Sequence, residues 1–290
     1  MSQYHTPVMV SEVLEGLQVG PGKHFIDATL GGGGHGIEIE KRGGVLLGMD
    51  TDSEAVEEAK KGFRDDGLGE RVKVVQGNFK DIQDIAKKNG FDIVDGILFD
   101  LGVSSHQLDT EARGFSYRFG DAPLDLRLNQ NEGIPASEYI AHTSEDELYE
   151  ILATYSEEEH SRAVSAAVVR SRVEHRIATT GDLLKIIEDV VGQRGAKGVA
   201  SRVFQALRIY VNDEFGALKM GLRGAKELLK PGGRLVVISF HSLEDRIVKQ
   251  FLKTDGWRLI TKKPVVAGEQ EQMENRRSRS AKLRVAEKIL

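Results

Sequence analysis

The sequence predicts an α/β fold in which a mostly parallel sheet is interrupted by a helical insertion. Up to about residue 104, short β-branched runs alternate with longer helical stretches, which is typical of βαβ units. About a hundred residues without a strong strand follow, and their apolar residues recur at spacings of three and four. The alternation then resumes. At 290 residues and 40% hydrophobic content, the chain can bury a core for such a fold.

Seven strands are expected, and the last two follow each other without a helix, which favours an antiparallel pair at one edge of the sheet. The expected strands are residues 23–29, 45–50, 71–76, 93–101, 235–240, 257–262 and 282–286. The expected helices beside them are residues 34–41, 53–63, 82–89, 214–229 and 243–252, with Ser53 as an N-cap and a turn at 230–233. Residues 268–279 have few apolar anchors and are predicted to form a mobile loop. The predicted domain limits are 1–104 and 206–290 for the two parts of the sheet domain, and 105–205 for the helical insertion.

Composition and charge restrict the class of protein. The chain has no cysteine, no secretory signal in residues 1–10 and no apolar run long enough for a membrane span, so a cytoplasmic protein without a membrane partner is expected. The net charge of −5 hides a polarised distribution. Residues 105–160 are strongly acidic, whereas residues 161–210 and 275–290 are basic. The basic segments indicate either a polyanion-binding surface or solvated helix faces that pair with the acidic segment.

A glycine-rich loop occupies residues 27–36, where the first strand turns into the first helix. Gly31, Gly33 and Gly36 fit the pattern G-x-G-x-x-G, in which glycines allow a ligand to approach the backbone and the helix N-terminal amides. A run of glycines satisfies many patterns, and a tight turn is the alternative. Asp50 ends the second strand about 20 residues later, where an acid binds ribose hydroxyls in nucleotide-binding folds. Asp52 is the competing candidate for that role.

Two further strands also end in informative residues. Phe79 follows the third strand and could cover an adenine, although a core position is its alternative, and Asp100 ends the fourth strand. Because the carboxyl ends of parallel strands share one edge, these residues predict a nucleoside pocket. Both a nicotinamide dinucleotide and S-adenosylmethionine would use such a pocket. The terminal antiparallel pair and the lack of a second mononucleotide-binding half favour S-adenosylmethionine.

Other candidate residues carry weaker signals. His241 follows the fifth strand. It is either part of the functional edge of the sheet or a structural histidine. Aromatic residues alternate with arginines in the segment 113–119, which could stack on a base or dock the insertion. These residues are Arg113, Phe115, Tyr117, Arg118 and Phe119. No histidine pair has convincing metal-ligand spacing, so no metal is expected.

Long blocks of the sequence resemble the RsmH/MraW family of bacterial methyltransferases. The blocks are His5-Thr6-Pro7-Val8, Asp27-Ala28-Thr29-Leu30-Gly31-Gly32-Gly33-Gly34-His35, Asp95-Gly96-Ile97-Leu98-Phe99-Asp100-Leu101-Gly102-Val103-Ser104-Ser105, Arg113-Gly114-Phe115-Ser116, Pro123-Leu124-Asp125-Leu126-Arg127, Phe204-Gln205-Ala206-Leu207-Arg208-Ile209-Tyr210-Val211-Asn212 and Ile238-Ser239-Phe240-His241-Ser242-Leu243-Glu244-Asp245-Arg246. They span nearly the whole chain in one order. The resemblance implies a Rossmann-like class I methyltransferase domain with an inserted helical RNA-recognition domain.

The resemblance also implies a reaction, in which a methyl group passes from S-adenosylmethionine to N4 of a cytosine in the decoding region of small-subunit (16S) ribosomal RNA. The cofactor-binding residues that it implies are Gly33, Gly34, His35, Asp50, Phe79, Asp100 and Gln107. The catalytic candidates are Asp100, Ser104 and His241, although Asp100 lacks the following prolines found in many amino methyltransferases. The expected partner is small-subunit ribosomal RNA, and both a monomer and a homodimer remain open. A nicotinamide-dependent oxidoreductase and a noncatalytic ribosome-assembly factor are the alternatives.

Overall fold

A computed structural model describes residues 7–289 of the chain, so the predicted His5-Thr6 part of the first block lies outside the described residues. The chain divides into two compact units. The first contains the described residues up to Gly102 and those from Phe215 onward, and the second is 103–214. Within residues 7–289, no helix is both long and apolar enough to cross a bilayer.

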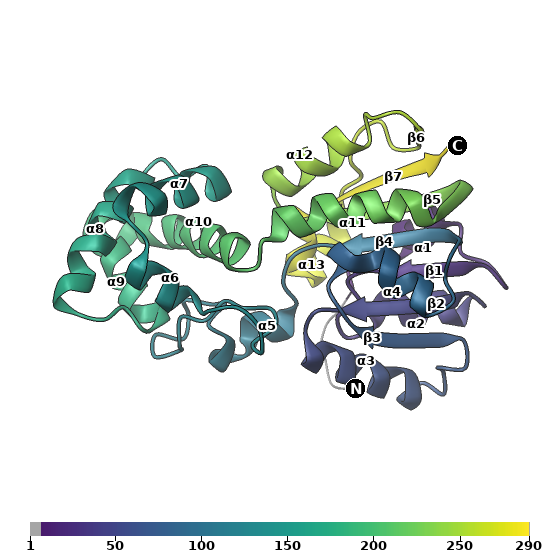
Figure 1. Cartoon of the computed structure of the whole chain (residues 1–290), viewed down its shortest axis with the longest axis horizontal. Helices are drawn as coiled ribbons and strands as arrows, with labels where there is room; N and C mark the ends of the chain where they lie inside the picture. The colour runs from purple at the N-terminus through teal and green to yellow at the C-terminus, as the bar shows by residue number, and fades with distance from the viewer. Residues whose placement is uncertain (1–6, 290) are drawn as a thin grey trace. The chain divides into compact units, whose positions relative to one another are not determined.

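The first unit is built on a seven-stranded sheet with the order β3-β2-β1-β4-β5-β7-β6 (Figure 1). The strands are β1 (His24–Asp27), β2 (Val45–Asp50), β3 (Val72–Gln76), β4 (Val94–Asp100), β5 (Leu229–Ser239), β6 (Trp257–Leu259) and β7 (Lys282–Lys288). Strands β1 to β5 pair in parallel, whereas β7 is antiparallel to both β5 and β6. The predicted seven-stranded, mostly parallel sheet with an antiparallel pair at one edge is therefore confirmed.

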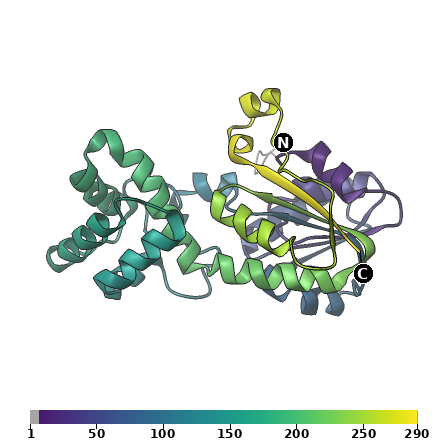
Figure 2. The same cartoon turned by 90° about the horizontal axis from the view of Figure 1, so that it is seen from above.

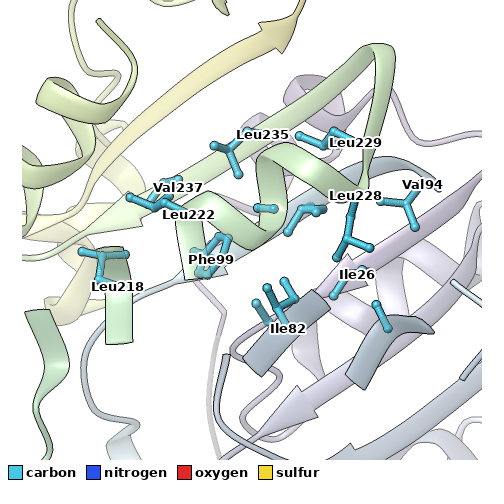
Figure 3. Close-up of a cluster of buried hydrophobic side chains, with 14 of the residues drawn as sticks. Ile26, Ile82, Val94, Phe99, Leu218, Leu222, Leu228, Leu229, Leu235 and Val237 are labelled. Carbon is cyan, nitrogen blue, oxygen red and sulfur yellow. The ribbon is translucent and has the colours of Figure 1, made fainter. Parts of the chain in front are cut away.

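Helices cover both faces of this sheet because its central strands are apolar on both sides (Figure 2). The helical elements of this unit are α1 (Val10–Leu17), α2 (Gly34–Lys41), α3 (Ser53–Asp65), η1 (Phe79–Asp81), α4 (Ile82–Lys88), α11 (Glu214–Leu228), α12 (Ser242–Phe251), α13 (Glu269–Glu274) and η3 (Arg276–Ser280). Along β5, Leu235 and Val237 pack on one face with α4, α11 and α12, whereas Val236 and Ile238 pack on the other with α1, α2 and α3. Figure 3 shows Leu222 of α11 directed toward the side chains of the sheet.

Several local predictions differ from the structure. Asp52, not Ser53, is the N-cap of α3, and its side chain accepts a hydrogen bond from the Glu54 amide at 3.0 Å. β5 begins at Leu229 because Val94 pairs with Leu229 and Gly96 with Arg234, so the predicted turn at 230–233 becomes a bulge within the strand. The predicted loop 268–279 instead contains α13 and η3. Helix α1 was not predicted.

The second unit is helical and has its own apolar core. Its elements are α5 (Ser105–Asp109), η2 (Glu111–Arg113), α6 (Ala136–His142), α7 (Glu145–Ser156), α8 (Ser161–Glu174), α9 (Thr180–Val191) and α10 (Gln193–Val211). The buried faces of α7, α8, α9 and α10 meet in one cluster that includes Leu152, Val168, Ile187 and Val203. The unit extends to Glu214, beyond the predicted limit at 205, because α10 continues to Val211.

The packing of α11 predicts a difference in stability between two neighbouring positions. Leu222 is fully buried against the sheet, whereas Met220 on the same helix is 50% exposed. Leu222→Ala should lower the free energy of unfolding by about 2–5 kcal/mol, and Met220→Ala by about 0.5 kcal/mol or less. Urea unfolding followed by circular dichroism measures both, and equal losses would contradict this packing.

Candidate functional site

The glycine-rich loop is tied to the end of β2 through Asp50. One carboxylate oxygen of Asp50 accepts a hydrogen bond from the Gly31 amide at 2.8 Å, and the other accepts one from the Asp52 amide at 2.9 Å. Each oxygen has a second lone pair, so the carboxylate can still accept hydrogen bonds from two ligand hydroxyls. Asp52 is occupied as the N-cap of α3. The two competing aspartates therefore have different roles, and Asp50 is the one at the loop.

The loop then turns into α2 at a position that requires glycine. Gly33 is the N-cap of α2 and has φ +86°, a left-handed conformation that favours glycine. The amides of Gly34 and His35 follow in the first helical turn, where backbone N–H groups have no acceptor within the helix. A Cβ on Gly36 would lie 2.7 Å from Leu46 Cδ2, so glycine here also lets α2 pack closely on β2. This is the geometry that the predicted motif requires.

Three ionisable side chains, those of His35, Asp100 and Asp27, lie close together near the glycine-rich loop. The His35 side chain is buried, and its Nε2 lies 2.8 Å from the Val8 carbonyl oxygen. Because a carbonyl only accepts, Nε2 carries the proton, and Nδ1 faces Asp100 Oδ2 at 3.8 Å. The Thr29 hydroxyl accepts a hydrogen bond from the Asp100 amide at 2.6 Å and so joins the ends of β1 and β4. The His35 side chain is therefore part of the framework, which leaves its backbone amide for a ligand.

Asp27 at the end of β1 completes this group and was missed as a site residue by the sequence analysis. It is fully buried, and burial raises its pKa to about 7, partly offset by the charge of His35. Its Oδ1 accepts a hydrogen bond from the Thr29 amide at 3.1 Å, whereas its Oδ2 has no hydrogen-bond partner among residues 7–289. Burial also raises the pKa of Asp50 to about 6, despite hydrogen bonds from the backbone amides of Asp52, Gly31 and Thr51. The sequence contained one indication that Asp27 belongs to the site, because it is the first residue of the glycine-rich segment 27–36.

Phe79 lies where β3 ends, as predicted, but it is also attached to the core. Its ring contacts Phe99 edge to face, with the ring centroids 5.6 Å apart, and a Cβ on Gly221 would lie 3.0 Å from it. The side chain is half-buried. The core alternative and the site role are therefore compatible, because only part of the ring is used in packing.

His241 forms the start of α12. Its Nδ1 accepts a hydrogen bond from the Glu244 amide at 3.4 Å, and its Nε2 lies 3.1 Å from Glu244 Oε1. Nδ1 thus caps α12, which agrees with the structural alternative, whereas Nε2 is buried without a hydrogen-bond partner among residues 7–289. A catalytic role for His241 stays a prediction.

Ser104 and Gln107 belong to the second unit and form a capping box at the start of α5. The Ser104 hydroxyl accepts a hydrogen bond from the Gln107 amide at 3.1 Å, and Gln107 Oε1 accepts one from the Ser104 amide at 2.9 Å. Ser104 follows Asp100 by four residues in the chain. The cap fixes the local conformation after β4, while the predicted roles of both residues remain predictions.

The segment 113–119 is used mainly in packing the second unit. The guanidinium of Arg113 is buried and donates to the carbonyls of Arg127 and Leu128 at 3.2 and 2.8 Å. Phe115 lies in the helical core, and Tyr117 contacts Phe204 edge to face. These contacts are internal to the second unit, so both the docking and the base-stacking interpretations stay predictions.

The basic segment of the second unit is only partly available for an anionic ligand. Arg202 pairs with the buried Glu158 at 2.5 Å, and Arg172 donates to the Ile140 and Thr143 carbonyls. Arg162 lies 4.1 Å over the Tyr149 ring, and Arg170 is exposed with no ion pair among the described residues. The alternative in which basic and acidic segments pair therefore holds for part of this surface. In the described part of the chain, no group of three or more His, Asp or Glu side chains could hold a metal ion.

The sheet order, the glycine loop and the acidic strand ends together define a Rossmann-like, class I methyltransferase architecture. The model of the MraW methylase family matches residues 2–289, so the chain belongs to this family. It is 48% identical over 287 residues to ribosomal RNA small subunit methyltransferase H of Deinococcus radiodurans, covering 98% of this chain and 89% of the relative. The protein of that name from Geobacter sulfurreducens is 44% identical over 315 residues, with full coverage of both chains.

Solved structures with similar folds have low sequence identity. TrmN from Thermus thermophilus has a TM-score of 0.49 at 14% identity, with 98% of this chain and 49% of that chain covered. A putative rRNA-methylase from Clostridium thermocellum has a TM-score of 0.48 at 14% identity, with 98% and 99% covered.

The raised pKa of Asp27 predicts how stability depends on pH. Its folded-state pKa of about 7 lies above the ordinary value of 3.8, so its contribution to stability is complete below about pH 4 and is lost as the pH rises through 7. Asn cannot ionise, so Asp27→Asn should make the free energy of unfolding fall less than in the parent protein between pH 5 and 8. Denaturant titrations at several pH values measure this slope. The exposed Asp65→Asn is the matched control and should keep the parent slope, whereas an unchanged slope in Asp27→Asn would disprove the assignment.

Proposed function

We propose that this chain transfers a methyl group from S-adenosylmethionine to N4 of a cytosine in the decoding region of small-subunit ribosomal RNA. Membership of a methylase family and full-length similarity to relatives named small subunit methyltransferase H support the reaction class and the RNA. The motif resemblance stated above supports the cytosine. The same membership weighs against the nicotinamide-dependent oxidoreductase.

The observation that carries the proposal is the surplus of carboxyl groups around the glycine loop. Asp27, Asp50 and Asp100 end three neighbouring strands, and Asp27 Oδ2 is buried without a hydrogen-bond partner among residues 7–289. Such an environment suits a nucleoside that carries positive charge on an ammonium and a sulfonium group. It would repel the pyrophosphate of a dinucleotide. The residues present therefore fit S-adenosylmethionine.

The residues divide the binding of this cofactor among them. Asp50 would accept hydrogen bonds from the ribose hydroxyls, and the backbone amides of Gly33, Gly34 and His35 would line the loop. Phe79 would cover the adenine, and Asp100 and Gln107 would complete the set. When bound, the cofactor supplies an electrophilic methyl group.

The acceptor amine requires help because the lone pair on cytosine N4 is delocalised into the ring. A carboxylate that accepts a hydrogen bond from this amine favours its nucleophilic form and can receive the proton. Asp100 ends β4, and its backbone amide donates a hydrogen bond to the Thr29 hydroxyl. The backbone from which the Asp100 carboxyl group extends is therefore held in place. We assign Asp100 this role, with Ser104 as the second group.

The second unit would hold the RNA. An amine that is base-paired is hidden, so the cytosine must be splayed out of its stack before transfer. Arg170 is exposed, as is Arg162 on Tyr149, and both suit contacts with phosphates.

The reaction itself can be tested with labelled cofactor. Incubation of the protein with methyl-labelled S-adenosylmethionine and small ribosomal subunits that lack the modification should yield label in N4-methylcytidine on nucleoside analysis. Label in another nucleoside would refute the cytosine assignment but keep the enzyme class. No label, together with RNA binding that is indifferent to the cofactor, would support the noncatalytic assembly factor instead.

The role of Ser104 can be separated from its role as a helix cap. Ser104→Ala removes both, whereas Ser144→Ala removes an equivalent capping box at α7 and touches nothing else in the proposal. Both variants should lose about 1 kcal/mol of stability. Only Ser104→Ala should lower turnover, by about tenfold or more, with the Kd for S-adenosylmethionine within twofold of the parent. Equal turnover in the two variants would remove Ser104 from the reaction.

A further inference from the structure

The segment that joins β6 to β7 carries a guanidinium group to the functional edge of the sheet. Val265 forms a β-bridge with Leu283, and Glu271 of α13 accepts a hydrogen bond from the Met9 amide at 2.7 Å. In η3, Asn275 Oδ1 accepts from the Arg277 amide at 3.1 Å, and the buried Ser278 donates to the Asn275 carbonyl at 2.8 Å. The backbone at Arg277 is therefore held in place by contacts on both sides.

The Arg277 side chain is positioned by Phe240. Its guanidinium carbon lies 5.1 Å from the centroid of the Phe240 ring, within the range of a cation–π contact. Phe240 follows β5, and its amide donates to Glu244 Oε2 at 2.9 Å. β5 is the parallel neighbour of β4, with Asp100 in register with Ile238. The guanidinium thus lies beside the strand end that carries Asp100.

The Arg277 side chain is more buried than that of a typical surface arginine. Burial lowers its pKa, and the negative charge of Asp100 acts in the opposite direction, so the two charges interact. An arginine remains protonated near neutral pH even so. It brings a planar, positively charged donor to an edge that otherwise has the carboxyl groups of Asp27, Asp50 and Asp100.

The order of the strands indicates which ligand this donor would meet. Phe79, Asp50, the glycine loop and Asp100 lie at β3, β2, β1 and β4 in turn, and these are the residues assigned to the cofactor and the amine. Arg277 belongs to η3 and contacts Phe240, which follows β5, the strand next to β4 in the sheet. Under the proposed function the acceptor nucleotide has to reach Asp100, and the anionic group that it would bring to this edge is a phosphate.

We propose that Arg277 binds a phosphate of the nucleotide that is methylated and thereby positions its amine next to Asp100. This inference rests on the proposed function. A guanidinium offers two parallel N–H donors to phosphate oxygens, and its stacking on Phe240 limits the conformational entropy lost on binding. The same donor could instead bind the carboxylate of the cofactor, or serve only as a counter-ion to Asp100, and the experiment distinguishes these cases.

The experiment compares Arg277→Ala and Arg277→Lys with Arg276→Ala, which removes a charge from the exposed neighbour in the same segment. The measurements are the Kd for unmodified small subunits as a function of salt, kcat and KM for methyl transfer, and the Kd for S-adenosylmethionine. Arg277→Ala should raise KM for the subunit at least tenfold and reduce the slope of log K against log salt by about 0.7 to 0.9, the value for one phosphate contact. Arg277→Lys should recover part of the affinity. Arg276→Ala should change KM less than threefold.

Three results would overturn the inference. A raised Kd for S-adenosylmethionine with an unchanged Kd for methylthioadenosine, which lacks the carboxylate, would assign Arg277 to the cofactor. A lower kcat with an unchanged salt slope would make it a counter-ion of Asp100. Equal losses in Arg276→Ala would reduce it to general surface charge. Absence of methyl transfer by the parent protein would instead refute the proposed function, while the binding measurements would still test the phosphate contact.

Discussion

Strand β1 has only four residues, yet it pairs with β2 on one side and β4 on the other, and this double pairing fixes the geometry of the site. The parallel registers place Asp27 beside Gly48 and Leu98, so β2 and β4 both end two residues beyond β1, at Asp50 and Asp100. Hydrogen bonds then lock the ends together, from the Gly31 amide to Asp50 and from the Asp100 amide to Thr29. The loop geometry, the buried carboxyl groups and the position of Arg277 all follow from strands held in this register.

This arrangement buries the carboxyl groups of Asp27 and Asp50, and their desolvation lowers the stability of the folded chain. Desolvation raises the pKa of both Asp27 and Asp50, which shows that the folded chain alone does not compensate these carboxyl groups fully. A protein that retains such groups without replacing them by apolar residues loses stability at the site. A cationic ligand relieves the penalty, so ligand binding and stability should be coupled through the same side chains.

Periodicity and glycine spacing were sufficient to predict the sheet, its antiparallel edge and the approximate limits of five helices beside it, because these depend on local pattern and on burial of both faces. They did not predict that Asp52 rather than Ser53 caps α3, since both residues favour an N-cap. Asp27 and Arg277 were not singled out as site residues, although Asp27 is the first residue of the glycine motif and Arg277 lies in the basic segment 275–290. Their contacts with His35, Phe240 and Asp100 depend on the fold, so neither the motif nor the charge distinguished them from their neighbours. The segment 268–279 looked mobile because its anchors, such as the bond from the Met9 amide to Glu271, are also long-range.

The last strand of the chain is an internal strand of the sheet, because β7 lies between β5 and β6. During synthesis on the ribosome, β5 has no neighbour on that side until residues 282–288 have emerged, although every other element of the sheet is already available. A nascent or prematurely terminated chain therefore presents an open β-edge, which is a target for chaperones and proteases. Because Arg277 precedes β7 in the chain, the antiparallel edge of the sheet is completed only after this arginine has been synthesised.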